Sequence, residues 1–156
     1  MSISGLEKLD VWCRAKDFAV RVHKELLPLL PPEEKYALSQ QLRRSSQSIP
    51  ANIAEGHGRF YFQDNVRFCY IARGSLEESL SHIVHAHGVD YISDEIYKNF
   101  AADGENLNRL INGYISFLKK SKQGANEPGV NYMVRDMPSD YIAEDSSSVP
   151  SDSNIE

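Results

Sequence analysis

Apolar residues recur every three or four positions in four stretches of the first 122 residues. This spacing follows one face of an α-helix, whereas a half-buried strand would alternate every second residue. The four stripes are Leu9, Trp12, Ala15, Ala19, Val22 and Leu26; Leu38, Leu42, Ile49 and Ile53; Val66, Cys69, Ala72, Leu76, Leu80 and Ile83; and Ile96, Phe100, Leu107, Ile111, Tyr114 and Leu118. Four such helices with short links bury their stripes most simply against one another. The pattern therefore predicts an all-α, up-down-up-down four-helix bundle over residues 1–122.

Helix-breaking residues set the expected boundaries. Pro28 and the Pro31-Pro32 pair end the first helix, because proline lacks a backbone donor and clashes with the preceding turn. We expect Pro32 to open the second helix, with Glu33 and Glu34 against its positive end. Pro50 lies inside this helix and predicts a kink.

The later boundaries depend on glycine and on one serine. Gly56 is expected to end the second helix in the left-handed conformation, before a short Gly-His-Gly-Arg connection. The third helix should end near Gly88, and Ser93 is expected to cap the fourth. The Asp103-Gly104 pair interrupts the fourth helical pattern.

Residues 123–156 have a different composition. They mix Gly, Pro, Ser and acidic residues without a sustained period, which predicts a disordered acidic tail. The net charge of −5 divides accordingly: residues 1–122 carry 16 Lys and Arg against 15 Asp and Glu, whereas residues 123–156 carry one Arg against seven acids. The acidity of the chain therefore belongs to its C-terminal part.

The middle of the chain is basic. Residues 35–73 hold six Lys and Arg but only two acids, Glu55 and Asp64. Arginine forks match phosphate oxygens in pairs, and aromatic rings at residues 60–62 are available to stack on unpaired bases. One hypothesis is a nucleic-acid-binding surface made of Arg43, Arg44, Arg59, Arg67 and Arg73. The alternative is that these arginines pair with nearby carboxylates, at positions 55, 64, 77 and 78, and hold helices together.

The second helix also carries a polar seam. Its members are spaced 4, 3, 4 and 3 positions apart: Gln41, Ser45, Ser48, Asn52 and Glu55. Small and amide side chains favour a close, hydrogen-bonded helix contact over an ordinary solvated face. Gly74 and Ser75 would let the third helix approach, and Glu78 could accept hydrogen bonds from the seam.

The sequence offers little for catalysis, for metal binding or for a membrane. His82, His85 and His87 cluster, but no Glu-x-x-His unit is present, so a surface or packing role is favoured. Phosphate-binding glycine loops, nucleophile elbows and zinc-protease motifs are missing, which predicts a non-enzymatic protein without a cofactor. Cys13 and Cys69 are isolated, as expected of reduced thiols in a cytoplasmic protein. The sequence predicts neither a signal peptide nor a membrane span.

Two motifs carry a family resemblance. The runs QLRRSSQSIPANIAEGHGR and FCYIARGSLEE, with the flanking PPEEKYAL and WCRAKDFAVRVHKEL, resemble the signature of the proteins encoded in intervening sequences of bacterial 23S rRNA genes. The resemblance spans about residues 6–122. The family's motif positions are held by Asn52, Glu55, Gly56, Arg59, Gly74, Ser75 and Glu78. Ser79 stands where the family commonly has leucine, so we expect one weaker core contact.

The resemblance implies a four-helix bundle that assembles as a ring-like homopentamer. Relatives serve as accessory subunits of the reverse transcriptases of diversity-generating retroelements, and RNA binding is presumed for the intervening-sequence proteins. Two functions are therefore expected of this chain: binding of RNA or DNA through the basic middle region, or service as a protein-interaction scaffold or reverse-transcriptase subunit. A further hypothesis is that the acidic tail folds over the basic surface and competes with nucleic acid.

Overall fold

The computed structural model describes residues 5–122, which form helices and no strand. Its four long helices are α1 (Asp10–Arg21), α2 (Leu38–His57), α3 (Phe62–Gly88) and α4 (Asp94–Ser121). Short helical turns accompany them: η1 (Gly5–Lys8), the π-helical η2 (Val22–Leu26), η3 (Leu27–Leu29) and η4 (Pro32–Glu34). The predicted disordered tail, residues 123–156, lies outside the described residues.

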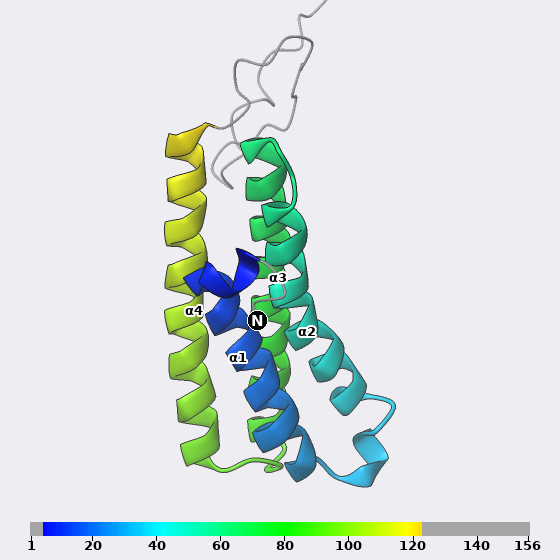
Figure 1. Ribbon diagram of the computed structural model, residues 1–156. Helices are drawn as coiled ribbons and strands as arrows, with labels where there is room; N and C mark the ends of the chain where they lie inside the picture. Colours follow the sequence, from blue (N-terminus) through cyan, green and yellow to red (C-terminus); the bar gives the residue numbers. More distant parts are fainter. Residues whose placement is uncertain (1–4, 123–156) are drawn as a thin grey trace, which may run out of the picture.

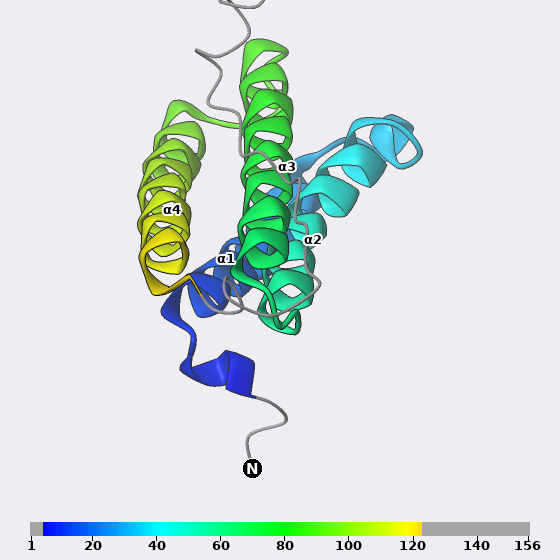
Figure 2. The ribbon, with the colours of Figure 1, turned by 90° about the horizontal axis from the view of Figure 1, so that it is seen from above.

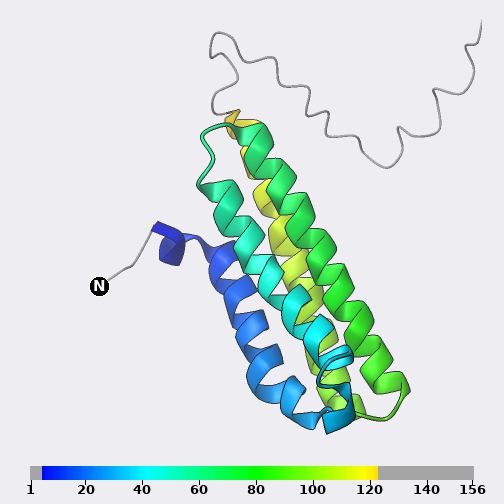
Figure 3. The ribbon, with the colours of Figure 1, turned by 90° about the vertical axis from the view of Figure 1, so that its right-hand side faces the viewer.

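The helices form the expected bundle, in which successive helices run in opposite directions (Figures 1 and 3). α3 packs between α2 and α4, and α1 completes the bundle by contacting both α2 and α4 (Figure 2). The all-α, up-down-up-down prediction is confirmed. No helix among residues 5–122 combines the length and apolarity that a bilayer span requires.

The predicted apolar stripes meet in one continuous core. Leu26, Leu42, Ile53, Leu76 and Ile111 are fully buried members of it. The prediction overlooked Val11 and Phe18 on α1, which are also buried. Phe18 meets Phe100 of α4 edge-on, with ring centroids 6.0 Å apart, and this contact ties the first helix to the last. Such edge-to-face pairs add to the burial of apolar area.

The beginning of α2 differs from the prediction. Pro32 opens only the single turn η4, and α2 begins at Leu38. The carboxylate of Glu34 explains the new start, because its Oε2 accepts a hydrogen bond of 3.1 Å from the backbone N–H of Leu38. A side chain four residues upstream thus satisfies one of the free donors at the helix start.

The fourth helix begins as predicted but is not interrupted. Ser93 caps it, since its Oγ accepts a hydrogen bond of 3.3 Å from the N–H of Ile96. The helix then continues through Asp103 and Gly104. Gly104 is buried, and a Cβ there would lie 2.5 Å from a methyl carbon of Leu80. This glycine therefore lets α3 and α4 approach rather than breaking the helix.

Candidate nucleic-acid interface

Three helix ends meet at one end of the bundle. α2 finishes at His57, α3 begins at Phe62, and α4 returns to the same level at Ser121 (Figure 1). Two contacts set this register between α3 and α4: Asn65 Nδ2 donates to the hydroxyl of Tyr114 over 3.2 Å, and Lys119 Nζ donates to the hydroxyl of Tyr70 over 3.0 Å. The last turns of α4 therefore lie beside the first turns of α3.

Cations from all three helix ends gather there. We call this surface the basic end and define it by six residues: Arg59, Arg67, Arg73, Lys119, Lys120 and Lys122. On the α2 side, the guanidinium of Arg59 lies 5.2 Å from the ring centre of Phe68. On the α4 side, Arg73 and Lys119 lie 4.8 and 5.5 Å from the ring centre of Tyr70. Arg67 is exposed on α3 between them, so the cations form a band across three helices.

Few of these charges are neutralised by carboxylates. Arg59 pairs with Glu55 over 2.8 Å, but Arg73 donates instead to the neutral amide oxygen of Asn112 over 2.9 Å. Within residues 5–122, the side chains of Arg67, Lys120 and Lys122 have neither an ion pair nor a hydrogen bond. Counted along the sequence, residues 55–73 and 119–122 together hold these six cations and two carboxylates, those of Glu55 and Asp64, a local balance of +4.

Exposed aromatic rings accompany the cations. Phe60, in the connection between α2 and α3, is 53% exposed, and Phe117 in the penultimate turn of α4 is 62% exposed. Phe117 stacks nearly parallel on Tyr114, at 6.3 Å between centroids, and Phe60 meets Tyr61 edge-on at 5.0 Å. Tyr61 and Phe62 are themselves half-buried. Rings supported in this way offer flat apolar surfaces beside positive charge.

The five predicted arginines do not share one patch. Arg59, Arg67 and Arg73 belong to the basic end, but Arg43 and Arg44 lie on the first half of α2. Arg44 is 13 residues before the end of α2, a rise of about 20 Å. Arg44 pairs with Glu78 of α3 over 3.0 Å, whereas Arg43 is exposed and has no such partner within residues 5–122. The pairing hypothesis therefore holds for Arg44 and for Arg59, whose partner is Glu55, and nucleic-acid binding by the five arginines stays a prediction.

The sequence interpretation did not include Lys119, Lys120 and Lys122 in the site. These lysines had a local explanation, since cations suit the negative end of a helix. The missed signal was the topology of the bundle. α3 has 27 residues and α4 has 28, and two antiparallel neighbours of nearly equal length, joined by a short connection, bring the end of one beside the start of the other.

The polar seam packs against α3 as predicted, over its central part. Ser45 is hydrogen-bonded to Ser79 at 2.8 Å, and Ser48 to Ser75 at 2.9 Å. Asn52 Nδ2 donates to the carbonyl and hydroxyl oxygens of Ser48, over 2.8 and 2.9 Å. The two ends of the seam differ from the prediction, because Gln41 and Glu55 are exposed. Glu78 accepts from Arg44 rather than from the seam.

The two motif glycines have different roles from those expected. Gly56 does not end α2 in the left-handed conformation; it is buried within the helix, which runs on to His57. A Cβ on Gly56 would lie 2.8 Å from Asn65 Oδ1 and 2.9 Å from Phe68 Cβ, so this glycine permits a close approach of α2 and α3. Gly74 does not serve the seam, because it is exposed and a Cβ there would have no neighbour within 4 Å.

The histidines do not converge on one site. His87 Nε2 lies 2.6 Å from Asp94 Oδ1, and its ring stacks on Tyr97 at 4.4 Å. His82 is 3.7 Å from Glu78, and His85 is exposed. Among residues 5–122, no group of three His, Cys, Asp or Glu side chains is arranged to hold a metal ion.

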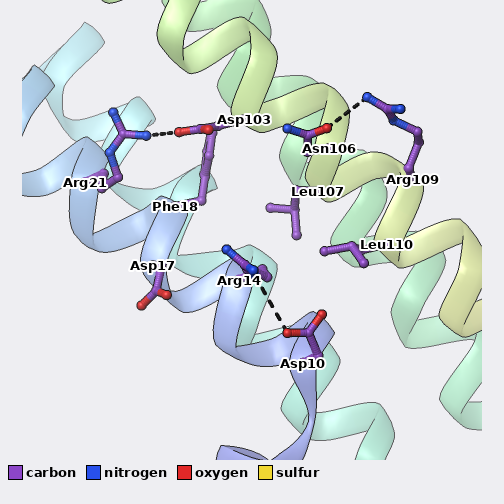
Figure 4. A pocket seen from close by; sticks show the side chains of 10 residues that line it. All are labelled: Asp10, Arg14, Asp17, Phe18, Arg21, Asp103, Asn106, Leu107, Arg109 and Leu110. Atoms are coloured by element: carbon purple, nitrogen blue, oxygen red, sulfur yellow. Dashed lines mark hydrogen bonds and ion pairs between the residues drawn. The ribbon is translucent and has the colours of Figure 1, made fainter.

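A groove of about 670 Å³ lies between α1 and α4 (Figure 4). Phe18, Leu107 and Leu110 line it, and its rim carries arginines and aspartates in equal number. Arg21 forms an ion pair with Asp103, and Arg14 lies 3.7 Å from Asp10. These charges offset each other, so the groove lacks the excess of positive charge that marks the basic end.

The fold and this charge distribution define a small helical protein whose distinctive surface is a positively charged end. The family model of the 23S rRNA-intervening sequence proteins matches residues 7–113, and the chain belongs to this family. The match ends before Lys119, Lys120 and Lys122, so these cations lie beyond it.

A solved structure shows the same fold. It is the crystal structure of a protein of unknown function of the S23 ribosomal protein family from Bacteroides thetaiotaomicron VPI-5482. The two chains are 29% identical, with a TM-score of 0.63, over 68% of this chain and 95% of the other. No curated protein matches the sequence.

Proposed function

We propose that this protein binds RNA through the basic end, without catalysing a reaction on it. The observation that carries the proposal is the set of cations without carboxylate partners, Arg67, Lys120 and Lys122, which α3 and α4 bring together beside Arg73. Such cations replace the counterions condensed along a phosphate backbone, and the release of those counterions drives binding.

The exposed rings favour single-stranded or unpaired RNA. Phe60 and Phe117 flank the cations, and unpaired bases stack on aromatic rings whatever their sequence. The family is named after intervening sequences of 23S rRNA, which makes RNA the first nucleic acid to test.

The test is to titrate the protein into a short, fluorescently labelled, mixed-sequence single-stranded RNA and to measure the fluorescence anisotropy of the RNA. The titration is repeated at several salt concentrations between about 50 and 200 mM. Arg67→Glu should weaken binding of all sequences and reduce the slope of log affinity against log salt by about 1. Arg43→Glu is the matched control, because Arg43 is also an exposed helical arginine without a partner in residues 5–122 but lies on the first half of α2. Absence of RNA binding at low salt, or equal losses in the two variants, would contradict the proposal.

A second candidate function is assembly with further protein subunits. α3 exposes Ile71 to 44% and Val84 to 54%, and apolar side chains in water favour a protein contact. Copies of the same chain are the partner that fits the expected homopentamer. Light scattering should then give five times the 17.6 kDa mass of the chain, and Ile71→Lys with Val84→Lys should lower that mass. A monomer mass for the unmodified protein would contradict this assembly.

A further inference from the structure

The charge of the chain changes from basic to acidic directly after the basic end. α4 ends at Ser121, and Lys122 belongs to the basic end. The following residues, 123–156, hold seven acids and one arginine, a net charge of −6. The first acid, Glu127, is five residues after Lys122 in the sequence, a length of chain that spans at most about 17 Å. The most acidic part of the sequence thus starts directly at the most basic part of the bundle.

We propose that the acidic segment 123–156 docks on the basic end and competes there with RNA. The docking itself does not depend on RNA, whereas the competition rests on the proposed function. Docking would change the local balance of charge from +4 to −2, and it would supply carboxylates to Arg67 and Lys120, which lack them within residues 5–122.

Other arginines of the bundle are less suited to this partner. Arg21 is already paired with Asp103 and Glu25, and Arg44 with Glu78. The groove between α1 and α4 carries as many aspartates as arginines. A carboxylate arriving at either place would meet charges that are already compensated.

The segment also offers apolar groups that suit the exposed rings. It contains Tyr132, Met133 and Val134, and later Tyr141 and Ile142. Phe60 and Phe117 expose more than half of their surface in the basic end. A segment that brings both carboxylates and apolar side chains matches both features of this surface, as RNA does with phosphates and bases.

The segment has a concentration advantage because it is covalently attached. Tethering through a short connection gives an effective concentration on the order of 1 mM. If the free segment bound with a Kd of about 0.1 mM, the attached segment would weaken RNA binding about tenfold. This is the size of effect that the experiments must detect.

The docking is tested first without RNA. A fluorescently labelled peptide of residues 123–156 is titrated with a chain of residues 1–122, in which all the buried apolar side chains of the described bundle, from Val11 to Leu118, are retained. We expect salt-sensitive binding that Arg67→Glu weakens at least several-fold and Arg43→Glu leaves unchanged. No binding at low salt, or equal weakening by both substitutions, would overturn the docking.

The competition is tested in the full chain. All seven acids of the segment are replaced by their amides: Glu127→Gln, Asp136→Asn, Asp140→Asn, Glu144→Gln, Asp145→Asn, Asp152→Asn and Glu156→Gln. RNA affinity at low salt should rise about tenfold. A control chain with Ser146, Ser147 and Ser148 changed to alanine keeps the charge and should bind as the unmodified protein does.

The two experiments separate the two proposals. Unchanged RNA affinity in the amide variant would overturn the competition even where the peptide binds. If no full-length chain binds RNA, the proposed function fails, while the peptide titration still decides whether the segment occupies the basic end.

Discussion

Ser79 of α3 and Ser45 of α2 are joined by a hydrogen bond of 2.8 Å between two almost completely buried hydroxyl groups. Ser79 occupies the position where the family resemblance suggested leucine and a weaker core contact. The structure shows instead that a polar contact replaces an apolar one. Each hydroxyl also lies near a carbonyl of its own helix, Leu42 O at 3.3 Å and Ser75 O at 2.9 Å, so both polar groups are satisfied without water.

This contact predicts the stability of two variants. Ser79→Ala should lower the free energy of unfolding by about 1 kcal/mol, because it removes one buried hydrogen bond. Ser79→Leu should cost about 1–3 kcal/mol or more, since extra methylene groups must enter a close helix contact. Urea unfolding measures both, with the exposed Ser81→Ala on the same helix as control. A leucine variant as stable as the unmodified protein would show that the α2–α3 contact has room that the structure lacks.

The two motif glycines should respond to alanine with opposite signs. Gly56→Ala forces a Cβ to within 3.0 Å of the backbone oxygen of Asn65, which cannot rotate away, so we expect a loss of about 1–3 kcal/mol. Gly74→Ala meets nothing within 4 Å and should stabilise α3 by about 0.8–1 kcal/mol, the difference in helix propensity. Thermal unfolding compares the pair directly. Equal effects of the same sign would contradict the assigned roles.

Acid should weaken the contact between His87 in the last turn of α3 and Asp94 in the first turn of α4. The hydrogen bond with His87 lowers the pKa of Asp94, and the charges of His87 and Lys98 lower it further. A carboxyl with a lowered pKa in the folded state contributes stability that is present above its unfolded pKa, near 3.8, and is lost as the pH falls through the folded pKa.

Asp94→Asn tests this contribution. The variant should unfold at lower urea concentration than the unmodified protein at about pH 5.5, and the difference should shrink well below pH 3.8. Glu95→Gln is the control, because it removes a carboxylate from the same turn of α4. A loss of stability that both variants share comes from the interaction of a carboxylate with the helix dipole. If the difference between the Asn variant and the unmodified protein stays constant with pH, the contact with His87 is not its source.

The elements that were predicted correctly depend on local patterns. The four apolar stripes have a helical period, and Ser93 is followed by the acidic first turn that a capped helix favours. The predicted start of α2 was wrong because the preference of proline for the first helical turn competes with the carboxylate of Glu34, which accepts a hydrogen bond from the backbone N–H of Leu38, six residues after Pro32. The outcome of such a competition depends on the position of one side chain, which a pattern does not contain.

The candidate site was predicted only in part for a related reason. Gly56 fits a helix terminator by its sequence context, but the close approach of α3 decides its role. Likewise, Arg44 is as basic in sequence as Arg67, and only the neighbouring helix shows that Arg44 is paired. Contacts between helices, which are invisible to period and composition, separate a structural arginine from one that is available to a ligand.

The two cysteines should differ in reactivity. Burial raises the pKa of the Cys69 thiol to about 12, and its Sγ lies 3.6 Å from Asn65 Oδ1 in the core beside α4. The thiolate is the reactive form, so Cys69 should resist a thiol reagent in the folded protein. Cys13 is only partly buried on α1.

At pH 8, an aromatic disulfide reagent should therefore modify one thiol per chain rapidly and the second only as the bundle unfolds. Cys13→Ser should abolish the rapid phase and retain the slow one, whose rate should rise with urea. Rapid modification of both thiols in the native protein would place Cys69 at an accessible surface and contradict the packing of α3 against α4.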